Sequence, residues 1–180
     1  MNQNELILNV LEIFKYIIPS LIIYGVIHVL LKNFFDAEFE KRKIELRVEN
    51  NKITLPVKLQ AYERMVVLME RMSPDALVFR VSSPGISATQ LKIALIQDIN
   101  TEYQHNVSQQ VYISHQAWQM VRIAKEETVN IINTSYSSLG PNAVGLDLSK
   151  GIFESMMKMD NIPTNKALDF LRREFHLLFD

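Results

Sequence analysis

The hydrophobic pattern of the chain is most pronounced near its beginning. From Tyr16 to Leu31 the sequence reads YIIPSLIIYGVIHVLL, sixteen residues without a formal charge, bracketed by Lys15 and Lys32. As a helix these residues cover about 24 Å, and apolar flanks extend the run toward the ~30 Å hydrocarbon core of a bilayer. The pattern predicts a single transmembrane helix over roughly residues 6–33.

A cleaved signal peptide and a buried helix of a soluble protein are the two alternatives to an anchor. A signal peptide begins with a basic segment and ends at a small-residue cleavage site. Here the first fourteen residues carry Glu5 and Glu12 without Lys or Arg, and FFDAEFEKRK follows the apolar run. We therefore favour an anchor that remains attached.

The basic residues around the apolar run predict its orientation. Lys32 and the cluster Lys41-Arg42-Lys43 follow the run, whereas only Lys15 and the amino terminus precede it. Because basic residues concentrate on the cytoplasmic side of membrane helices, the C-terminal part is expected in the cytoplasm. The predicted localisation is the inner (cytoplasmic) membrane, with a single pass.

Polar side chains form a line along the predicted anchor. They recur every three or four residues, at Glu5, Asn9, Glu12, Tyr16, Ser20, Tyr24 and His28. Lipid cannot satisfy such groups, so a polar line on a membrane helix usually faces another helix. This predicts contacts with a membrane protein or a second copy through Glu5, Asn9, Glu12, Ser20 and His28. The alternative is an incidental line near the interface, with Glu12 paired to Lys15.

The remaining chain predicts a mainly α protein, a helical bundle in the cytoplasm. We divide it into an anchor (1–35), a charged stalk (36–55) and a helical domain (56–180). Asn50 and Asn51 are expected to end the stalk helix, and a new helix is expected to start near Pro56. Apolar residues at helical spacing predict the domain's helices at 56–72, 76–81, 88–106, 115–132, 148–159 and 164–178. A strand is the alternative for ALVFRV at 76–81, because its apolar residues also alternate.

Two serines are predicted to begin helices. Ser87 precedes the helix at 88–106, and Ser114 precedes the helix that contains Trp118. Serine is favoured at such positions because its side-chain oxygen accepts a bond from a free backbone N–H. Residues 133–147, rich in Ser, Asn, Gly and Pro, are expected to form a long loop, of the kind that often carries function.

The segment EYQHNVSQQVYISHQAW, residues 102–118, gathers polar and aromatic side chains that raise three hypotheses. Glu102 and His105 have the Glu-x-x-His spacing of helical metal sites, but di-iron bundles need two copies and we find one. Ser114 and His115 are adjacent, which does not make a nucleophile and its base. We favour a helix junction in which Tyr103 and Trp118 pack and amides satisfy backbone groups.

Composition and the absence of known motifs argue against several classes of function. The net charge of −1 argues against a nucleic-acid surface, and the absence of cysteine removes thiolate chemistry and disulfides. No Walker loop, dinucleotide fingerprint or Gly-x-Ser-x-Gly elbow is found. We predict no catalytic residues, metal or cofactor.

The last helix presents a possible partner surface. Leu168, Leu171, Phe175 and Leu178 lie along one side of residues 164–178, and Phe170 and Leu177 lie elsewhere on it. This is more apolar surface than one neighbouring helix need cover. Packing within the monomer is the alternative.

Three segments carry a resemblance to a known family: LPVKLQAYERMVVLMERMSP, EYQHNVSQQVYISHQAW and AKEE. The chain resembles a family of bacterial membrane-anchored helical proteins of unknown function. The resemblance spans most of the chain and implies the architecture, with no activity, substrate or cofactor. We expect a non-enzymatic scaffold or accessory subunit of a membrane assembly, partnered by a membrane protein or by itself. The alternative is a membrane-tethered enzyme or metal-binding protein that uses Glu102, His105 and His115.

Overall fold

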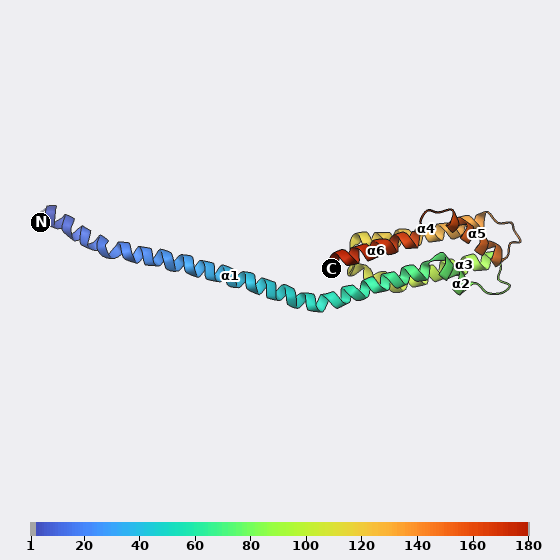
Figure 1. Ribbon diagram of the computed structural model, residues 1–180, viewed down its shortest axis with the longest axis horizontal. Coiled ribbons are helices and arrows are strands. Elements are labelled where there is room, and N and C mark those ends of the chain that lie inside the picture. Colours follow the sequence, from blue (N-terminus) through green and yellow to red (C-terminus); the bar gives the residue numbers. More distant parts are fainter. Residues whose placement is uncertain (1–2, 180) are drawn as a thin grey trace. The chain divides into compact units, whose positions relative to one another are not determined.

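The computed structural model describes residues 3–179, with side chains described at residue 12 and at residues 15–178 (Figure 1). Over this range the chain is mainly α, as predicted, and forms six α-helices and one short 3₁₀ helix. Their bounds are α1 Gln3–Met72, α2 Pro74–Val81, α3 Ala88–Asn106, η1 Val107–Val111, α4 His115–Ser137, α5 Gly145–Met157 and α6 Pro163–Phe179. The chain divides into two compact units, Met1–Thr54 and Leu55–Asp180.

The first unit is helical throughout its described length. Its described side chains are exposed, apart from the half-buried Glu38. Within Lys15–Met72 the helix contains a stretch that is long and apolar enough to cross a membrane, and none of that stretch is buried. This rules out a core helix within the chain, and it is compatible with a membrane anchor or with a signal sequence.

The predicted helix break at Asn50 and Asn51 is wrong. Both residues lie inside α1, and the Thr54 hydroxyl donates to the Asn50 carbonyl oxygen at 2.9 Å within the helix. Asparagine costs only a few tenths of a kcal/mol relative to good helix formers, so strong neighbours on both sides outweigh it. Pro56 likewise lies inside α1, where it does not start a new helix.

The second unit is built around a single apolar core. The end of α1 buries Met65, Leu68 and Met69, and α3 buries Leu91, Leu95 and Ile99 at helical spacing. The helix α4 contacts α3, α5 and α6. The side chains that it buries at helical spacing include Trp118, Val121, Ala124, Thr128, Ile131 and Ile132. The segment ALVFRV lies in the helix α2, as predicted, and does not form a strand.

Both predicted caps are confirmed. Ser87 Oγ accepts from the Gln90 backbone N–H at 3.2 Å, and the Gln90 side chain accepts from the Ser87 N–H at 3.2 Å. Ser114 Oγ accepts from the Ala117 N–H at 3.0 Å. These bonds satisfy donors that the first helical turn leaves unpaired, and so fix where α3 and α4 begin.

The loop predicted over residues 133–147 is shorter than expected. The helix α4 continues to Ser137, and α5 begins at Gly145. The polar side chains that suggested a loop bond within the bundle instead. Ser137 Oγ donates to the Asn133 carbonyl at 2.9 Å, and the buried Ser135 hydroxyl lies 3.2 Å from that of Ser155.

Two loops are joined by an isolated antiparallel bridge between Ser87 and Val144. The Gly145 N–H donates to the Ile86 carbonyl at 2.8 Å, and the Ala88 N–H donates to the Ala143 carbonyl at 3.2 Å. These bonds hold the starts of α3 and α5 side by side. A Cβ built on Gly145 would lie 2.5 Å from Ile86 Cγ2 and 2.9 Å from its carbonyl oxygen.

We therefore predict that Gly145→Ala lowers the free energy of unfolding by about 1–3 kcal/mol, because the added methyl forces the paired loops apart. Gly140→Ala is the matched control, since nothing lies within 4 Å of its added Cβ. We expect that control to change stability by less than about 0.5 kcal/mol. Denaturant unfolding of the full chain in mild detergent, followed by Trp118 fluorescence, measures both. Equal stability of the two variants would contradict the role of the loop pair.

Candidate functional site

The segment 102–118 is a helix junction, as predicted. It comprises the end of α3, the 3₁₀ helix η1 and the first turn of α4. The Tyr103 and Trp118 rings stack with centroids 5.2 Å apart, and Lys125 Nζ lies 4.7 Å from the centre of the Tyr103 ring. Aromatic stacking of this kind contributes packing energy beyond burial alone. The polar and aromatic side chains of this segment thus lie where α3 and α4 contact each other.

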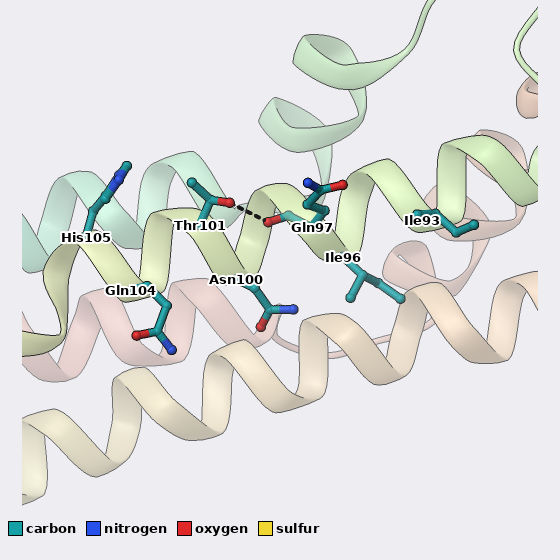
Figure 2. Close-up of a pocket in the computed structure, with 7 residues that line it drawn as sticks. All are labelled: Ile93, Ile96, Gln97, Asn100, Thr101, Gln104 and His105. Atoms are coloured by element: carbon teal, nitrogen blue, oxygen red, sulfur yellow. Dashed lines mark hydrogen bonds between the residues drawn. The ribbon is translucent and has the colours of Figure 1, made fainter.

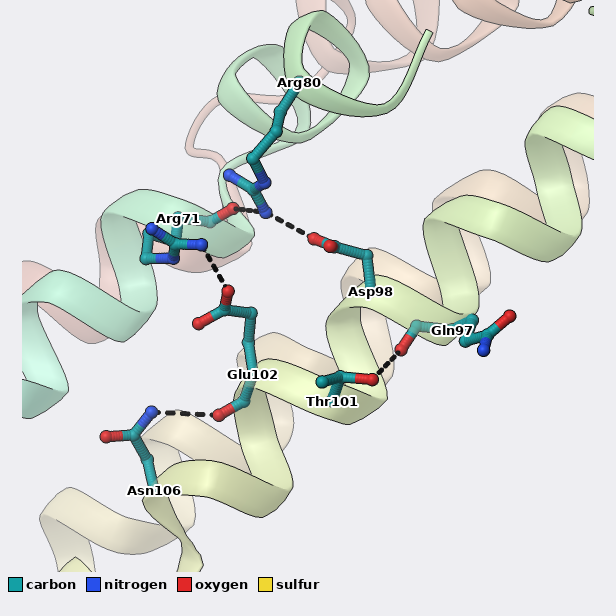
Figure 3. Close-up of polar contacts among 7 residues, drawn as sticks. All are labelled: Arg71, Arg80, Gln97, Asp98, Thr101, Glu102 and Asn106. Carbon is teal, nitrogen blue, oxygen red and sulfur yellow. Dashed lines mark hydrogen bonds and ion pairs between the residues drawn. The ribbon is translucent and has the colours of Figure 1, made fainter.

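Glu102 belongs to a network of ion pairs that joins α1, α2 and α3 (Figure 3). Its Oε1 lies 2.5 Å from Arg71 Nη2, and Arg80 pairs with Asp98. Arg80 also donates to the Arg71 carbonyl at 3.1 Å. The bond to Glu102 raises the pKa of the Arg71 guanidinium. These pairs hold α2 and the end of α1 against α3.

The three residues of the enzyme hypothesis make different contacts. Glu102 is bound by Arg71, whereas His105 lies at the end of a shallow hollow along α3 (Figure 2). His115 Nε2 lies 2.9 Å from Gln119 Nε2, one turn further along α4. Among the residues whose side chains are described, no group of three or more His, Asp or Glu is arranged to hold a metal ion.

The hollow along α3 is open to solvent and has a volume of about 590 Å³. Its lining comes from one side of α3: Ile93, Ile96, Gln97, Asn100, Thr101, Gln104 and His105. Most of its exposed lining is apolar, and Figure 2 shows the amide side chains of Asn100 and Gln104 extending toward the neighbouring helix. No charged carboxylate or cation lines it, so it offers hydrogen bonds without an ionic anchor.

A second, more apolar groove of about 440 Å³ lies between the end of α1 and α6. It is lined by Leu59, Tyr62, Glu63, Val66, Val67, Leu171, Arg172, Phe175 and His176. At its base the Tyr62 hydroxyl donates to Glu174 Oε2 at 3.0 Å, and the Tyr62 ring meets that of Phe175 edge to face. Burial, and then the bond to Glu174, raise the pKa of Tyr62 to about 12.

The predicted partner surface on α6 divides into covered and uncovered residues. Leu168 and Leu171 are 3% and 1% exposed, so both belong to the core of the unit. Phe175 is half-buried beside Tyr62, and Leu178 is 58% exposed. Leu177, which the sequence placed on another side of the helix, is 86% exposed. The accessible apolar surface therefore lies at the C-terminal end of α6.

The predicted contact residues of the anchor lie on α1. The side chains of Glu5 and Asn9 fall outside the described residues, whereas Glu12, Ser20 and His28 are exposed. Ser20 Oγ donates to the Tyr16 carbonyl at 2.9 Å, and the His28 ring stacks on Tyr24 with centroids 6.2 Å apart. The serine is therefore satisfied by its own helix, while the histidine and Glu12 remain open to a neighbour.

Phe79 is an exposed apolar residue that the sequence analysis did not single out, and its side chain on α2 is 91% exposed. Helical spacing separates Phe79 from Leu77 and Val78, which face the core. The helical spacing of α2 is the signal that identifies Phe79 as exposed.

Comparison with protein families gives a match over residues 8–178, to a family of unknown function, DUF7935. The chain belongs to DUF7935. No curated protein matches it, and no solved structure matches it. The DUF7935 match covers both the apolar stretch of α1 and the helical unit, so the two parts occur together in the family's own definition.

Tyr62 provides a test of the contact between α1 and α6. Because its folded pKa of about 12 exceeds the ordinary value of 10.0, its contribution to stability is complete below pH 10. That contribution is then lost as the pH rises through 12. The chain has six tyrosines, and their ionisation is followed by absorbance near 295 nm. We predict that the last phase of this titration, the late phase, belongs to Tyr62 and is absent in Tyr62→Phe.

Tyr112→Phe is the control for this titration, because it removes a tyrosine that is 44% exposed. The late phase should persist in that variant. If instead Tyr62→Phe leaves the late phase intact, Tyr62 is not the last tyrosine to ionise, and the burial of its ring between α1 and α6 is contradicted.

Proposed function

We propose that this protein is a membrane-anchored scaffold or accessory subunit of a membrane protein assembly, which acts by binding other helices. The observation that carries the proposal is the uncharged, exposed stretch from Tyr16 to Leu31. Ile, Leu and Val side chains there are 45–63% exposed. Exposed apolar area on this scale favours transfer into lipid, at about 25 cal/mol per Å².

The flanking side chains support an anchor with its C-terminal unit in the cytoplasm. Lys15 and Lys32 lie at the two ends of the apolar stretch, where their ammonium groups can reach the lipid head groups. The cluster Lys41-Arg42-Lys43 follows and favours the cytoplasmic side. Ion pairs of Arg42 with Glu38 and of Lys43 with Glu40 reduce its attraction to anionic lipid.

Two surfaces support binding to a partner rather than to a small substrate. Within the membrane, Glu12 and His28 lie exposed on α1, and an ionisable group there costs free energy unless it is packed. Beyond the membrane, Leu177 and Leu178 are exposed at the end of α6, next to the groove that contains Val67. Apolar surface with a polar rim is typical of protein contacts.

The alternative of a membrane-tethered enzyme draws less support from the geometry. It requires Glu102 as a ligand or base, whereas this carboxylate is only 16% exposed and pairs with Arg71. A metal would have to displace that guanidinium. Metal titration of the purified chain, with His105→Ala as control, tests the alternative directly.

We predict that the full chain stays in the membrane pellet after carbonate extraction, with an intact mass that includes its first residues. Ile22→Arg with Ile27→Arg should release it, because each arginine costs about 2.5–3.5 kcal/mol at the centre of a membrane helix. Phe79→Arg with Val111→Arg, which alters exposed residues of the second unit, should leave it in the pellet. A mature protein that lacks the apolar stretch would identify a signal sequence instead.

The polar line generates a separate prediction about the partner. Asn9→Leu with Glu12→Leu should weaken co-purification of a membrane partner in mild detergent by roughly five- to a hundredfold, from two lost interhelical bonds. Ile18→Leu with Ile22→Leu, on the other side of α1, is the matched control. Undiminished co-purification with the first pair would show that the polar line does not face the partner.

A further inference from the structure

Pro56 lies inside a long helix and leaves a gap in the backbone hydrogen bonds of that helix. The helix α1 continues through this residue, from Gln3 to Met72. Proline has no backbone N–H, so the carbonyl of Lys52, four residues earlier, lacks the donor that a regular helix would supply. The proline ring also crowds that carbonyl, and proline is a usual cause of bends in helices. The turn before Pro56 is therefore incompletely bonded.

The residues of this turn also have a weak preference for helix. Asn50, Asn51 and Thr54 belong to the less favourable helix residues. The Thr54 hydroxyl donates to the Asn50 carbonyl at 2.9 Å, and a bond of this kind slightly destabilises a helix and often bends it. Two ion pairs support the helix within residues 38–43, whereas residues 50–56 contain only one charged side chain.

Packing does not compensate for these local costs. Every side chain from Asn50 to Lys58 is exposed, and Ala61 is the first buried residue that follows them. Helices in proteins owe most of their stability to the packing of one face, and a helix without such packing is only marginally stable in water. The core of the second unit therefore stabilises α1 from Ala61 onward, and leaves the turn before Pro56 without support.

Pro19 leaves the same gap in the apolar part of α1, but with a different consequence in the proposed anchor. Lipid contains no water to bond a freed carbonyl, so opening the helix there costs much more free energy than opening it in water. Water reaches the backbone before Pro56, because the side chains around it are exposed. The helix therefore opens more readily before Pro56 than before Pro19.

We propose that residues 50–56 form a joint in α1, which opens transiently and lets the helix bend. The boundary between the two compact units, after Thr54, falls within the joint. The core of the second unit begins beyond the joint, so that unit stays folded when the joint opens. The use of the joint rests on the proposed function: bending lets the exposed Leu177 and Leu178 meet a membrane partner at more than one angle.

Limited digestion of the full chain with trypsin in mild detergent measures how often the joint opens. Trypsin cleaves after Lys and Arg where the backbone is free of helix, so cleavage between Lys52 and Ile53 reports on the joint. The cleavage rate follows the population of the open form when opening and closing are fast. We expect this cut to precede the cut after Arg64, because Met65, the next residue, is buried in the core.

Pro56→Ala restores the missing N–H and removes the ring, so it should slow the cut after Lys52 by more than about tenfold. Val57→Ala is the matched control, because it changes the adjacent exposed side chain and leaves every backbone N–H in place. We expect that control to change the rate by less than about threefold. Rates are divided by those of the denatured chains, which removes direct effects on the protease. An unchanged rate in Pro56→Ala, or equal slowing in Val57→Ala, would overturn the proposal.

A distance measurement tests the bending itself. The chain has no cysteine, so Glu45→Cys with Gln60→Cys, both at exposed positions, carry two spin labels on either side of the joint. A straight helix would place these positions about 22 Å apart. We expect a broad distribution that includes shorter distances and narrows in Pro56→Ala. Gln119→Cys with Thr134→Cys has the same spacing within α4 and should give a narrow distribution. An equally narrow distribution across the joint would overturn the bending.

Failure of the joint and failure of the proposed function give different results. Carbonate extraction tests the anchor, and Pro56→Ala should leave the chain in the membrane pellet because it does not alter the apolar stretch of α1. A chain that stays in the pellet but has a rigid α1 contradicts the joint alone. A chain that leaves the pellet but bends at residues 50–56 contradicts the anchor alone.

Discussion

Burial of the end of α1 in the second unit is the constraint on which the rest of the molecule depends. Met65, Leu68 and Met69 are at most 1% exposed, and Tyr62 and Arg71 on the same stretch bond to α6 and α3. Removing this stretch would open the core on one side and leave Glu102 without its cation. The exposed apolar part of α1 is thus continuous, through one helix, with a segment that the bundle cannot lose without unfolding.

Local chemistry explains why much of the fold could be predicted. The start of α3 is determined by Ser87 and Gln90, three residues apart, and its inward side by Leu91, Leu95 and Ile99 at helical spacing. Both signals lie within a single element, so they are visible in the sequence without knowledge of the neighbours. The same holds for Ser114 and the buried side of α4.

Contacts between distant segments explain what could not be predicted. Glu102 suggested a pair with His105, three positions later, yet its partner Arg71 lies 31 positions earlier. The pairing of Ile86 with Gly145 likewise joins two loops that carry no common motif. The low helix propensity of Asn50 predicts a helix end, but its neighbours in α1 favour the helix strongly enough to outweigh it.

The distribution of accessible surface supports the proposal that this protein binds other helices over the alternative of chemistry on a small molecule. The paired carboxylates and guanidiniums, Glu102 with Arg71 and Asp98 with Arg80, neutralise one another between helices. Exposed apolar side chains instead run along α1 from Tyr16 to Leu31, and Leu177 and Leu178 are exposed at the end of α6. Apolar side chains in water gain free energy when another surface covers them, whereas ion pairs already satisfied within the fold gain little from a ligand. Covering the exposed apolar side chains of its helices is therefore the process that would release most free energy when this protein binds a partner.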